Sequence, residues 1–252
     1  MKKIALLLIL LLLLSCSSDD ESEAYTITLS FSHNWDGITV TSSDFNVIKF
    51  TNANGEELSI ERLRYLISDL KLEKSSGETI IIDGYNLIDV TNGENLEFSP
   101  STTIPKGTYS KVSFVFGFTN EKNSDGVYPD LNSASWNVPV MLGGGYHYMQ
   151  LDGKFINSNS EEHGYNYHAI RAADNPGSNP TFPQDTFFEV NLGSITVSND
   201  TTLNIEMNIA EWFKNPNVWD LNTLNQMLMP NSSAQILMHA NGQNVFSLKS
   251  ID

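Results

Sequence analysis

The sequence predicts an all-β protein, a β-sandwich of about nine or more strands with one or two short helices near the C-terminus. Two observations support this fold class. Apolar and polar residues alternate over short stretches, most clearly in residues 25–32 and 109–118, as in strands with one buried face. Asp-Gly, Asn-Gly and Pro-containing turn signals separate such stretches. With 40% hydrophobic residues in 252, the chain can also bury a substantial core.

The remaining elements follow from the same patterns. Residues 60–72 carry apolar side chains on both parities, which indicates a strand with a bulge. Asp83-Gly84 predicts a hairpin turn between residues 80–82 and 85–90, and residues 119–144 form a long ordered loop. Residues 210–214 and 220–229 are predicted to be helical, with Asp220 as the N-cap of the second. Further strands are predicted over 45–51, 146–155, 165–171, 187–192, 203–209 and 244–249.

The N-terminus has the features of a bacterial lipoprotein signal. Lys2 and Lys3 precede an apolar run from Ile4 to Leu14, which is shorter than the roughly 20 residues that span a bilayer. The run ends in Leu-Leu-Ser-Cys, which resembles a lipobox and implies that Cys16 is acylated. We therefore expect a signal peptide over 1–15, a lipidated Cys16 with an acidic tether over 16–24, and one domain over 25–252.

The lipoprotein signal also predicts where the protein is located. Acyl chains on Cys16 would attach the domain to a membrane. Acidic residues directly after such a cysteine resemble an export signal for the outer face of the outer membrane, so we expect a cell-surface location. The tether sequence is SSDDESE.

Charge and motif content exclude several functions. A formal charge of −16 argues against nucleic-acid binding, because a polyanion must be neutralised by Lys and Arg. The chain lacks the common catalytic and nucleotide-binding motifs, and its one cysteine belongs to the lipid signal. We predict no enzymatic activity. Gly143–Gly145 precedes a strand instead of a helix, so it is interpreted as a turn that allows close backbone approach.

The histidines are the candidate ligands for a metal. His33 ends the first strand and shares its parity with Trp35, so it could reach another strand. His147 shares its parity with Met149, and His168 with Asn166. Each of these histidines could also be a hydrogen-bonded core residue. Imidazole with nearby thioether sulfur suits copper, and methionines 141, 149 and 238 lie close to histidines in the sequence.

Two further groups of side chains have the chemistry of binding residues. Asn123, Asp125 and Asp130 offer oxygen ligands but lack the spacing of a calcium loop, which argues against calcium there. Trp136, in the long loop, could stack on a sugar or fill the loop's own small core.

Several stretches together resemble the MbnP-like family of bacterial envelope proteins. They cover most of residues 27–249 in the family's order, and the WNVP…GGGYHYMQLDG block with its spacing to YNYH carries most of the resemblance. The stretches are FSHNWDG, ERLRYLISDLKL, IPKGTYSKVSFVFGF, WNVPVMLGGGYHYMQLDGKF, YNYHAI, AEWFKNPNVWD and NGQNVFSL.

The family resemblance implies a β-rich domain with a mononuclear copper site. In characterised members, histidines bind copper beside a tryptophan that a di-haem peroxidase-like partner has oxidised to kynurenine. By position, the resemblance implies His33 and His168 as ligands, with His147 as a third candidate. Trp35 and Trp136 are both candidates for the modified aromatic, although WNVPVMLGG replaces the family's aromatic-rich segment here.

Two functional hypotheses follow. The first is a surface lipoprotein that binds copper through histidines for acquisition or buffering. The second is a binding module for glycan or protein that holds no metal and uses Trp136, Tyr146 and Tyr148 as an exposed contact surface.

Overall fold

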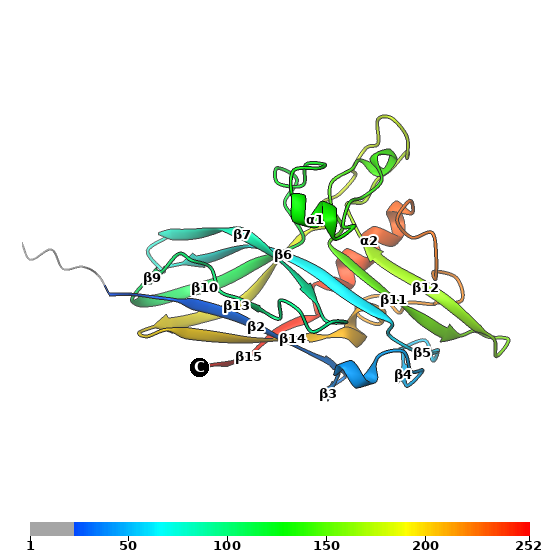
Figure 1. Ribbon diagram of the computed structural model, residues 1–252, viewed down its shortest axis with the longest axis horizontal. Coiled ribbons are helices and arrows are strands. Elements are labelled where there is room, and N and C mark those ends of the chain that lie inside the picture. The colour runs from blue at the N-terminus through cyan, green and yellow to red at the C-terminus, as the bar shows by residue number, and fades with distance from the viewer. Residues whose placement is uncertain (1–22) are drawn as a thin grey trace, which may run out of the picture.

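The computed structural model describes residues 23–252, in which two large β-sheets pack face to face (Figure 1). The predicted all-β sandwich is confirmed, since the described residues contain fifteen strands and two α-helices. Apolar side chains from the inner faces of both sheets form one continuous core.

The larger sheet has eight strands, and β6 (Arg62–Glu73) is its central strand. One edge of β6 pairs along most of its length with β7 (Thr79–Asp89). On the other edge, β10 (Gly107–Phe116) pairs with the second half of β6 and β11 (Met149–Ile156) pairs with the first half. The sheet therefore continues in two directions, as Figure 1 shows. Its outer strands are β13 (Phe188–Val197) beside β10, and β12 (Glu162–Ala169), β5 (Glu57–Leu58) and β4 (Phe50–Thr51) beyond β11.

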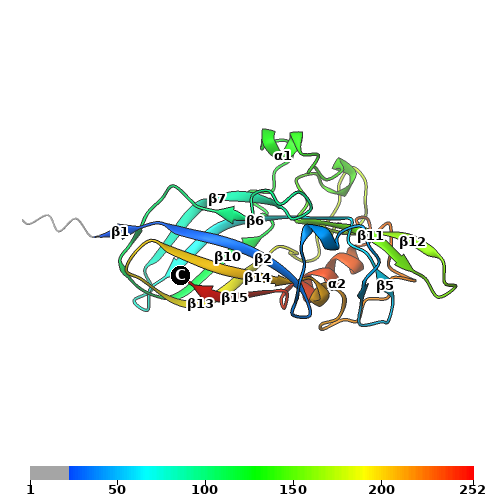
Figure 2. The same cartoon turned by 60° about the horizontal axis from the view of Figure 1, so that its bottom comes forward.

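The smaller sheet covers the inner face of the larger one (Figure 2). Its central pair, β2 (Ile27–Trp35) and β14 (Thr201–Asn208), is parallel, although every other pairing between the strands is antiparallel. The alternation predicted for 25–32 is observed, because Ile27, Leu29 and Phe31 are buried in the core. The flanking strands are β15 (Phe246–Ile251), β3 (Ile38–Thr39) and β8 (Glu97–Phe98). A separate small ribbon pairs β1 (Ala24–Tyr25) with β9 (Ile104–Pro105), and short 3-10 helices η1 (Ser42–Asp44) and η3 (Ile209–Phe213) complete the connections.

Between β10 and β11 the chain leaves the sheet over residues 117–148, a segment named here the excursion. It contains α1 (Pro129–Ser133) and the 3-10 helix η2 (Val140–Leu142). The expectation of an ordered loop is confirmed, because the excursion has its own buried cluster on the outer face of β6. This cluster comprises Leu66, Phe118, Leu131, Trp136 and Tyr146.

The glycine turn predicted at 143–145 is also present. Gly145 has φ +79°, and a Cβ atom there would lie 2.5 Å from Asn123 Oδ1. Glycine therefore allows the excursion to pass close to its own starting segment before β11 begins.

The predicted hairpin at Asp83-Gly84 is wrong. Residues 79–89 form one strand, β7, whose register against β6 shifts between Ser68 and Leu70. Asp69 adopts φ +51° at this point, and the Lys122 ammonium group contacts both Asp69 and Asp83. The turn signal therefore marks a bulge that is held together by an ion pair from the excursion.

The predicted helix over 220–229 is also wrong. This segment forms turns, and the α-helix α2 covers Ser232–Gly242, with the Asn231 side chain accepting from the Ala234 amide as N-cap. The backbone of the turn segment is instead hydrogen-bonded to a distant strand, since the Asn225 carbonyl accepts from the Asn166 amide of β12.

Of the strand predicted over 45–51, only Phe50–Thr51 is formed.

The expected aromatic contact surface is not exposed. Trp136, Tyr146 and Tyr148 are each 0% exposed, because Trp136 and Tyr146 lie in the excursion's own cluster and Tyr148 lies in the main core. Residues 1–22, which include the predicted signal peptide, Cys16 and most of the acidic tether, lie outside the described residues. None of the helices between residues 23 and 252 is long and apolar enough to cross a membrane.

Candidate metal centre

A polar row crosses the outer face of the larger sheet where β6, β11 and β12 lie side by side. On β11, Gln150 is in register with His168 of β12, and Asp152 with Asn166. On the other side of β11, Gln150 is in register with Arg64 of β6, and Asp152 with Arg62. These six residues together are named here the polar row. Because side chains alternate along a strand, these six residues share the outer face, and their neighbours in the strands point into the core.

Asp152 is the centre of this row. Its carboxylate accepts hydrogen bonds from Arg62 Nε at 2.5 Å, Asn166 Nδ2 at 2.5 Å and His168 Nε2 at 2.7 Å. Burial by itself would raise the pKa of Asp152, but the hydrogen bonds from His168, Asn166 and Arg62 lower it to about 2. The ionised carboxylate accepts the hydrogen bond from His168 Nε2, and Nδ1 of that ring has no hydrogen-bond partner among the described residues.

His147 lies next to His168, with ring centroids 5.3 Å apart and planes at 80°. Its Nδ1 donates to the Trp136 carbonyl at 2.9 Å, which leaves the Nε2 lone pair without a hydrogen-bond partner among the described residues. Burial lowers the pKa of His147 to about 4 against the effect of its hydrogen bond to the Trp136 carbonyl, and electrostatic repulsion from His168, Arg62 and Arg64 adds to the lowering. The ring is therefore neutral near pH 7 and can act as a metal ligand.

Trp136 packs against His147 of this pair. Its ring centroid is 5.6 Å from that of His147, and the Arg64 guanidinium lies 5.1 Å from the indole ring. Arg64 is held in place by Gln150, to which it donates at 2.5 Å. Among residues 23–252, the buried indole Nε1 finds no hydrogen-bond acceptor. The site thus combines two imidazoles with an unsatisfied indole N–H.

A hollow of about 340 Å³ opens beside His168, and sequence reasoning did not identify two of the residues that line it. Met227 and Met229 lie at its wall, together with Asn166, Leu228 and Pro230. Met227 is 78% exposed and has φ +56°, an unfavourable backbone conformation for a non-glycine residue. Two methionines therefore line the same hollow as the His168 side chain.

The comparisons with known proteins agree with this architecture. The model of the MbnP family matches residues 24–237. The chain belongs to the MbnP family. The resemblance inferred from the motifs is therefore confirmed.

One solved structure supports the fold of this MbnP family member. MbnP from Methylosinus trichosporium aligns over 78% of this chain and 80% of its own with a TM-score of 0.50. The sequence identity is 14%, so the likeness concerns the fold alone. A search of curated proteins finds no match.

His33 and Trp35 are not part of the His147–His168 pair in this family member. His33 Nε2 and the Tyr65 hydroxyl are hydrogen-bonded at 3.0 Å inside the core, and Tyr65 faces the opposite side of β6 from Arg64. Trp35 stacks on Phe50 at 4.8 Å and donates to the Thr51 carbonyl. The structure therefore brings together His147, His168 and Trp136, and it separates them from His33 and Trp35.

The other candidate ligands have different surroundings. Methionines 149 and 238 are core residues, and methionine 141 is exposed on η2. Asn123 and Asp125 accept hydrogen bonds from the amides of Tyr146 and Gly145, so they hold the excursion in shape. Among residues 23–252 there is no group of three or more His, Cys, Asp or Glu side chains that could hold a metal ion. A site here would depend on two imidazoles and their surroundings.

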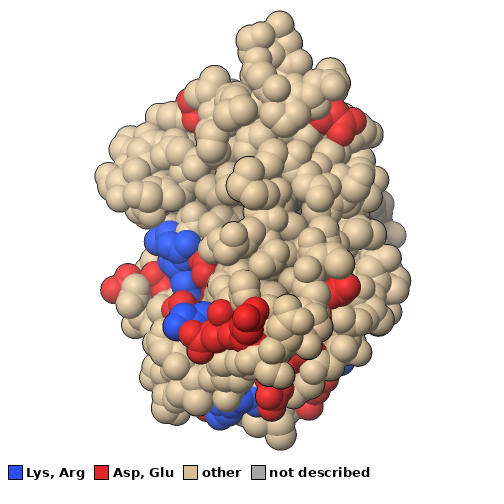
Figure 3. Space-filling model, turned by 90° about the vertical axis from the view of Figure 1, so that its right-hand side faces the viewer, with Lys and Arg blue, Asp and Glu red and all other residues tan. Residues whose placement is uncertain are grey.

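The end of the molecule that carries β11 and β12 is shown in Figure 3. Charged side chains gather in the lower half of this face, and the upper half, where the loops above β11 lie in Figure 1, carries few of them.

Proposed function

We propose that this MbnP family member binds one copper ion through His147 and His168, for acquisition or buffering instead of catalysis. The observation that carries the proposal is the pair of adjacent imidazoles, each with one ring nitrogen hydrogen-bonded and the other without a partner among the described residues. Imidazole nitrogen is a good copper ligand, and family membership favours copper over the other metals that imidazole binds.

The surroundings of the two rings suit a metal site. Histidine ligands commonly donate their second ring N–H to a carboxylate or a carbonyl, which fixes the tautomer and the ring orientation. Here Asp152 does this for His168 and the Trp136 carbonyl does it for His147. Met229 and the exposed Met227 offer soft thioether sulfur at the adjacent hollow, and these are the candidates for a further ligand.

In this proposal His33 is a core residue and Trp136 is the tryptophan of the site. Trp136 therefore takes the position that the resemblance assigns to the modified aromatic, and a di-haem peroxidase-like protein is the corresponding partner. The chain would be attached through lipidated Cys16 to the outer membrane and exposed at the cell surface, where it could encounter copper directly.

A copper titration of residues 17–252 with a competing chelator tests the site. We expect the His147→Ala and His168→Ala variants each to bind at least about 100-fold more weakly, since each loses one of two ligands. Asp152→Asn removes a supporting carboxylate and should cost about 10- to 100-fold in affinity. His163→Ala, an exposed histidine on the same strand as His168, is the matched control and should bind as the wild type does.

Equal affinity in the wild type and the His147→Ala/His168→Ala double variant would contradict the proposal. Loss of copper binding in a His33→Ala variant that keeps the wild-type melting temperature would instead indicate that copper binds on the core face of the sheet.

A further inference from the structure

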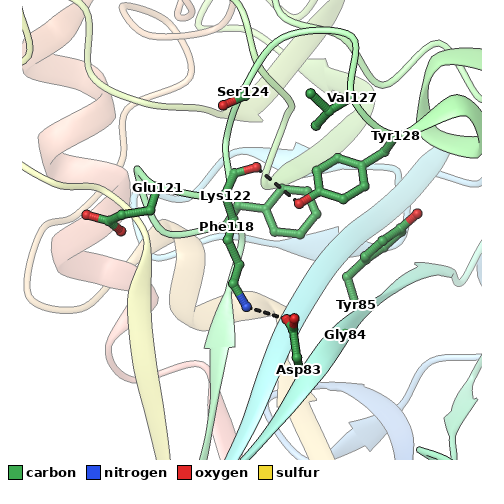
Figure 4. A pocket seen from close by; sticks show the side chains of 9 residues that line it. All are labelled: Asp83, Gly84, Tyr85, Phe118, Glu121, Lys122, Ser124, Val127 and Tyr128. Carbon is green, nitrogen blue, oxygen red and sulfur yellow. Dashed lines mark hydrogen bonds and ion pairs between the residues drawn. The ribbon is translucent and has the colours of Figure 1, made fainter.

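A second hollow, of about 480 Å³, lies away from the histidine pair (Figure 4). It forms between the bulge of β7 and the first part of the excursion. Because residues far apart in the sequence make its two sides, its shape depends on the folded chain. Its lining residues are Asp83, Gly84, Tyr85, Phe118, Glu121, Lys122, Ser124, Val127 and Tyr128.

Two half-buried tyrosines form an aromatic corner in this hollow. The rings of Tyr85 and Tyr128 are 4.8 Å apart at 66°, and Phe118 stacks behind Tyr128 at 4.7 Å. Both hydroxyl groups are already bonded, since Tyr85 donates to Asp130 at 2.6 Å and Tyr128 donates to the Lys122 carbonyl at 3.2 Å. What the two rings offer a ligand is therefore mainly their carbon surface, held rigidly at an angle.

The rim of the hollow carries both hydrogen-bond donors and acceptors. Glu121 and Ser124 are exposed, and the Asp83 side chain is 84% exposed beside Lys122. Lys122 lowers the pKa of Asp83, and the pKa of Glu121 is lowered by hydrogen bonds from its own amide and from Thr119, so both carboxylates are ionised. The Lys122 charge is compensated by Asp69 and Asp83, which leaves no free positive charge for a phosphate or sulfate.

We propose that this hollow binds the ring of a neutral sugar. A pyranose has an apolar face that packs on an aromatic ring, and hydroxyl groups that each donate and accept hydrogen bonds. The Tyr85–Tyr128 corner supplies the packing surface. The Asp83 and Glu121 carboxylates, the Ser124 hydroxyl and the Lys122 ammonium group supply the polar partners. The site is separate from the proposed copper site and does not depend on it.

An organic cation is the main competitor for this hollow, because aromatic faces and carboxylates also attract positive charge. The sugar is favoured because the Lys122 ammonium group already occupies the position between Asp69 and Asp83. Glu121 is then the one lining carboxylate outside that ion pair.

Isothermal titration calorimetry of the full-length protein, in a detergent without a sugar headgroup, tests the proposal. The probes are the methyl glycosides of glucose, galactose, mannose and N-acetylglucosamine, with maltotriose and cellotriose to distinguish a single ring from a glycan chain. Tetramethylammonium chloride is the organic-cation probe. We expect millimolar binding of at least one sugar probe, tighter binding of a trimer if the natural ligand is a chain, and no heat from the cation.

Val127→Arg is the informative variant, because residue 127 is 52% exposed at the mouth of the hollow and a large side chain there would obstruct it. Val47→Arg, at a position that is 50% exposed and outside the hollow, adds the same charge and is the matched control. Tyr128→Leu removes one aromatic face and should weaken sugar binding about three- to tenfold.

Three outcomes would overturn the proposal. The first is binding of none of the six sugars by a folded wild-type protein. The second is sugar binding that Val127→Arg and Val47→Arg change equally, which would place it elsewhere. The third is a heat from tetramethylammonium alone that Val127→Arg abolishes, which would make the hollow an organic-cation site.

Discussion

Two histidines that look alike in the sequence have different surroundings in the fold. His33 and His147 are both buried, and burial lowers the pKa of each to about 4. The His33 ring lies among core side chains and is hydrogen-bonded to the Tyr65 hydroxyl, whereas the His147 ring faces His168 on the outer side of the sheet. A histidine that must stay neutral to remain buried makes stability depend on pH.

We predict that the free energy of unfolding falls as the pH is lowered from 6.5 towards 4. In this window the unfolded chain gains a proton at residue 33 and the folded chain does not. Above pH 6.5 both states are neutral there, so the effect vanishes. At pH 5 the loss from His33 should be about 2 kcal/mol, at about 1.4 kcal/mol for each pH unit.

The measurement is urea unfolding at pH 7.5 and 5 for the wild type and His33→Gln, which keeps a hydrogen-bond acceptor and cannot titrate. A smaller pH effect in His33→Gln is expected, and an unchanged effect would contradict the assignment. Exposed His163→Gln is the control and should keep the wild-type pH effect.

At the scale of elements, the register of β11 determines which side chains lie together in the candidate centre. Its register against β6 and β12 places Asp152 between Arg62 and Asn166, and a shift of one residue would turn Asp152 into the core. Gly153 follows directly, where β11 passes close to the chain before β6. A Cβ atom at Gly153 would lie 2.1 Å from the Ser59 carbonyl oxygen.

Gly153→Ala should therefore destabilise the protein, by about 1–3 kcal/mol or more, because backbone must move to admit the methyl group. Gly164→Ala is the matched control: the position pairs with Lys154 on the neighbouring strand, and a Cβ there would approach nothing closer than 3.7 Å. Thermal unfolding of both variants checks this. Equal melting temperatures for the two would show that the approach of β11 to Ser59 is not tight.

At the scale of the whole molecule, the start of β1 and the C-terminus lie at one end, and β11 and β12 lie at the other (Figure 1). An anchor attached before β1 would therefore be placed at the opposite end from the polar row. This arrangement would leave the candidate centre accessible in a protein that is held at a membrane.

We predict that Cys16→Ser abolishes incorporation of a radioactive fatty acid into the protein. The serine cannot form the thioether on which lipoprotein processing depends, and the domain from residue 25 onward should fold unchanged. Label that enters the variant as it enters the wild type, or fails to enter the wild type, would contradict the lipoprotein assignment. The control is the melting temperature of the full-length Cys16→Ser variant, which should equal that of the wild type.

The sequence by itself determined the fold class, the family and most strands, because alternation and turn chemistry are local. Its predictions were wrong where contacts with distant residues override a local signal. Asp83-Gly84 forms a bulge that Lys122 holds in place, instead of a hairpin turn. In residues 220–229, a backbone carbonyl accepts a hydrogen bond from β12, and no helix forms. Parity assigned His147 to the face of Met149, yet β11 begins only at Met149 and the ring lies against His168.

Only the tertiary structure decided which histidines meet. Cross-strand register places His168 beside Asp152, and the folded excursion brings His147 and Trp136 to the same point. Met227 and Met229 line the hollow beside His168 although they come from a segment about 60 residues further along the chain, and nothing in the sequence around them indicates this. These contacts depend on packing between distant segments, and the free energy that fixes them is spread over the whole core and not contained in any short stretch of sequence.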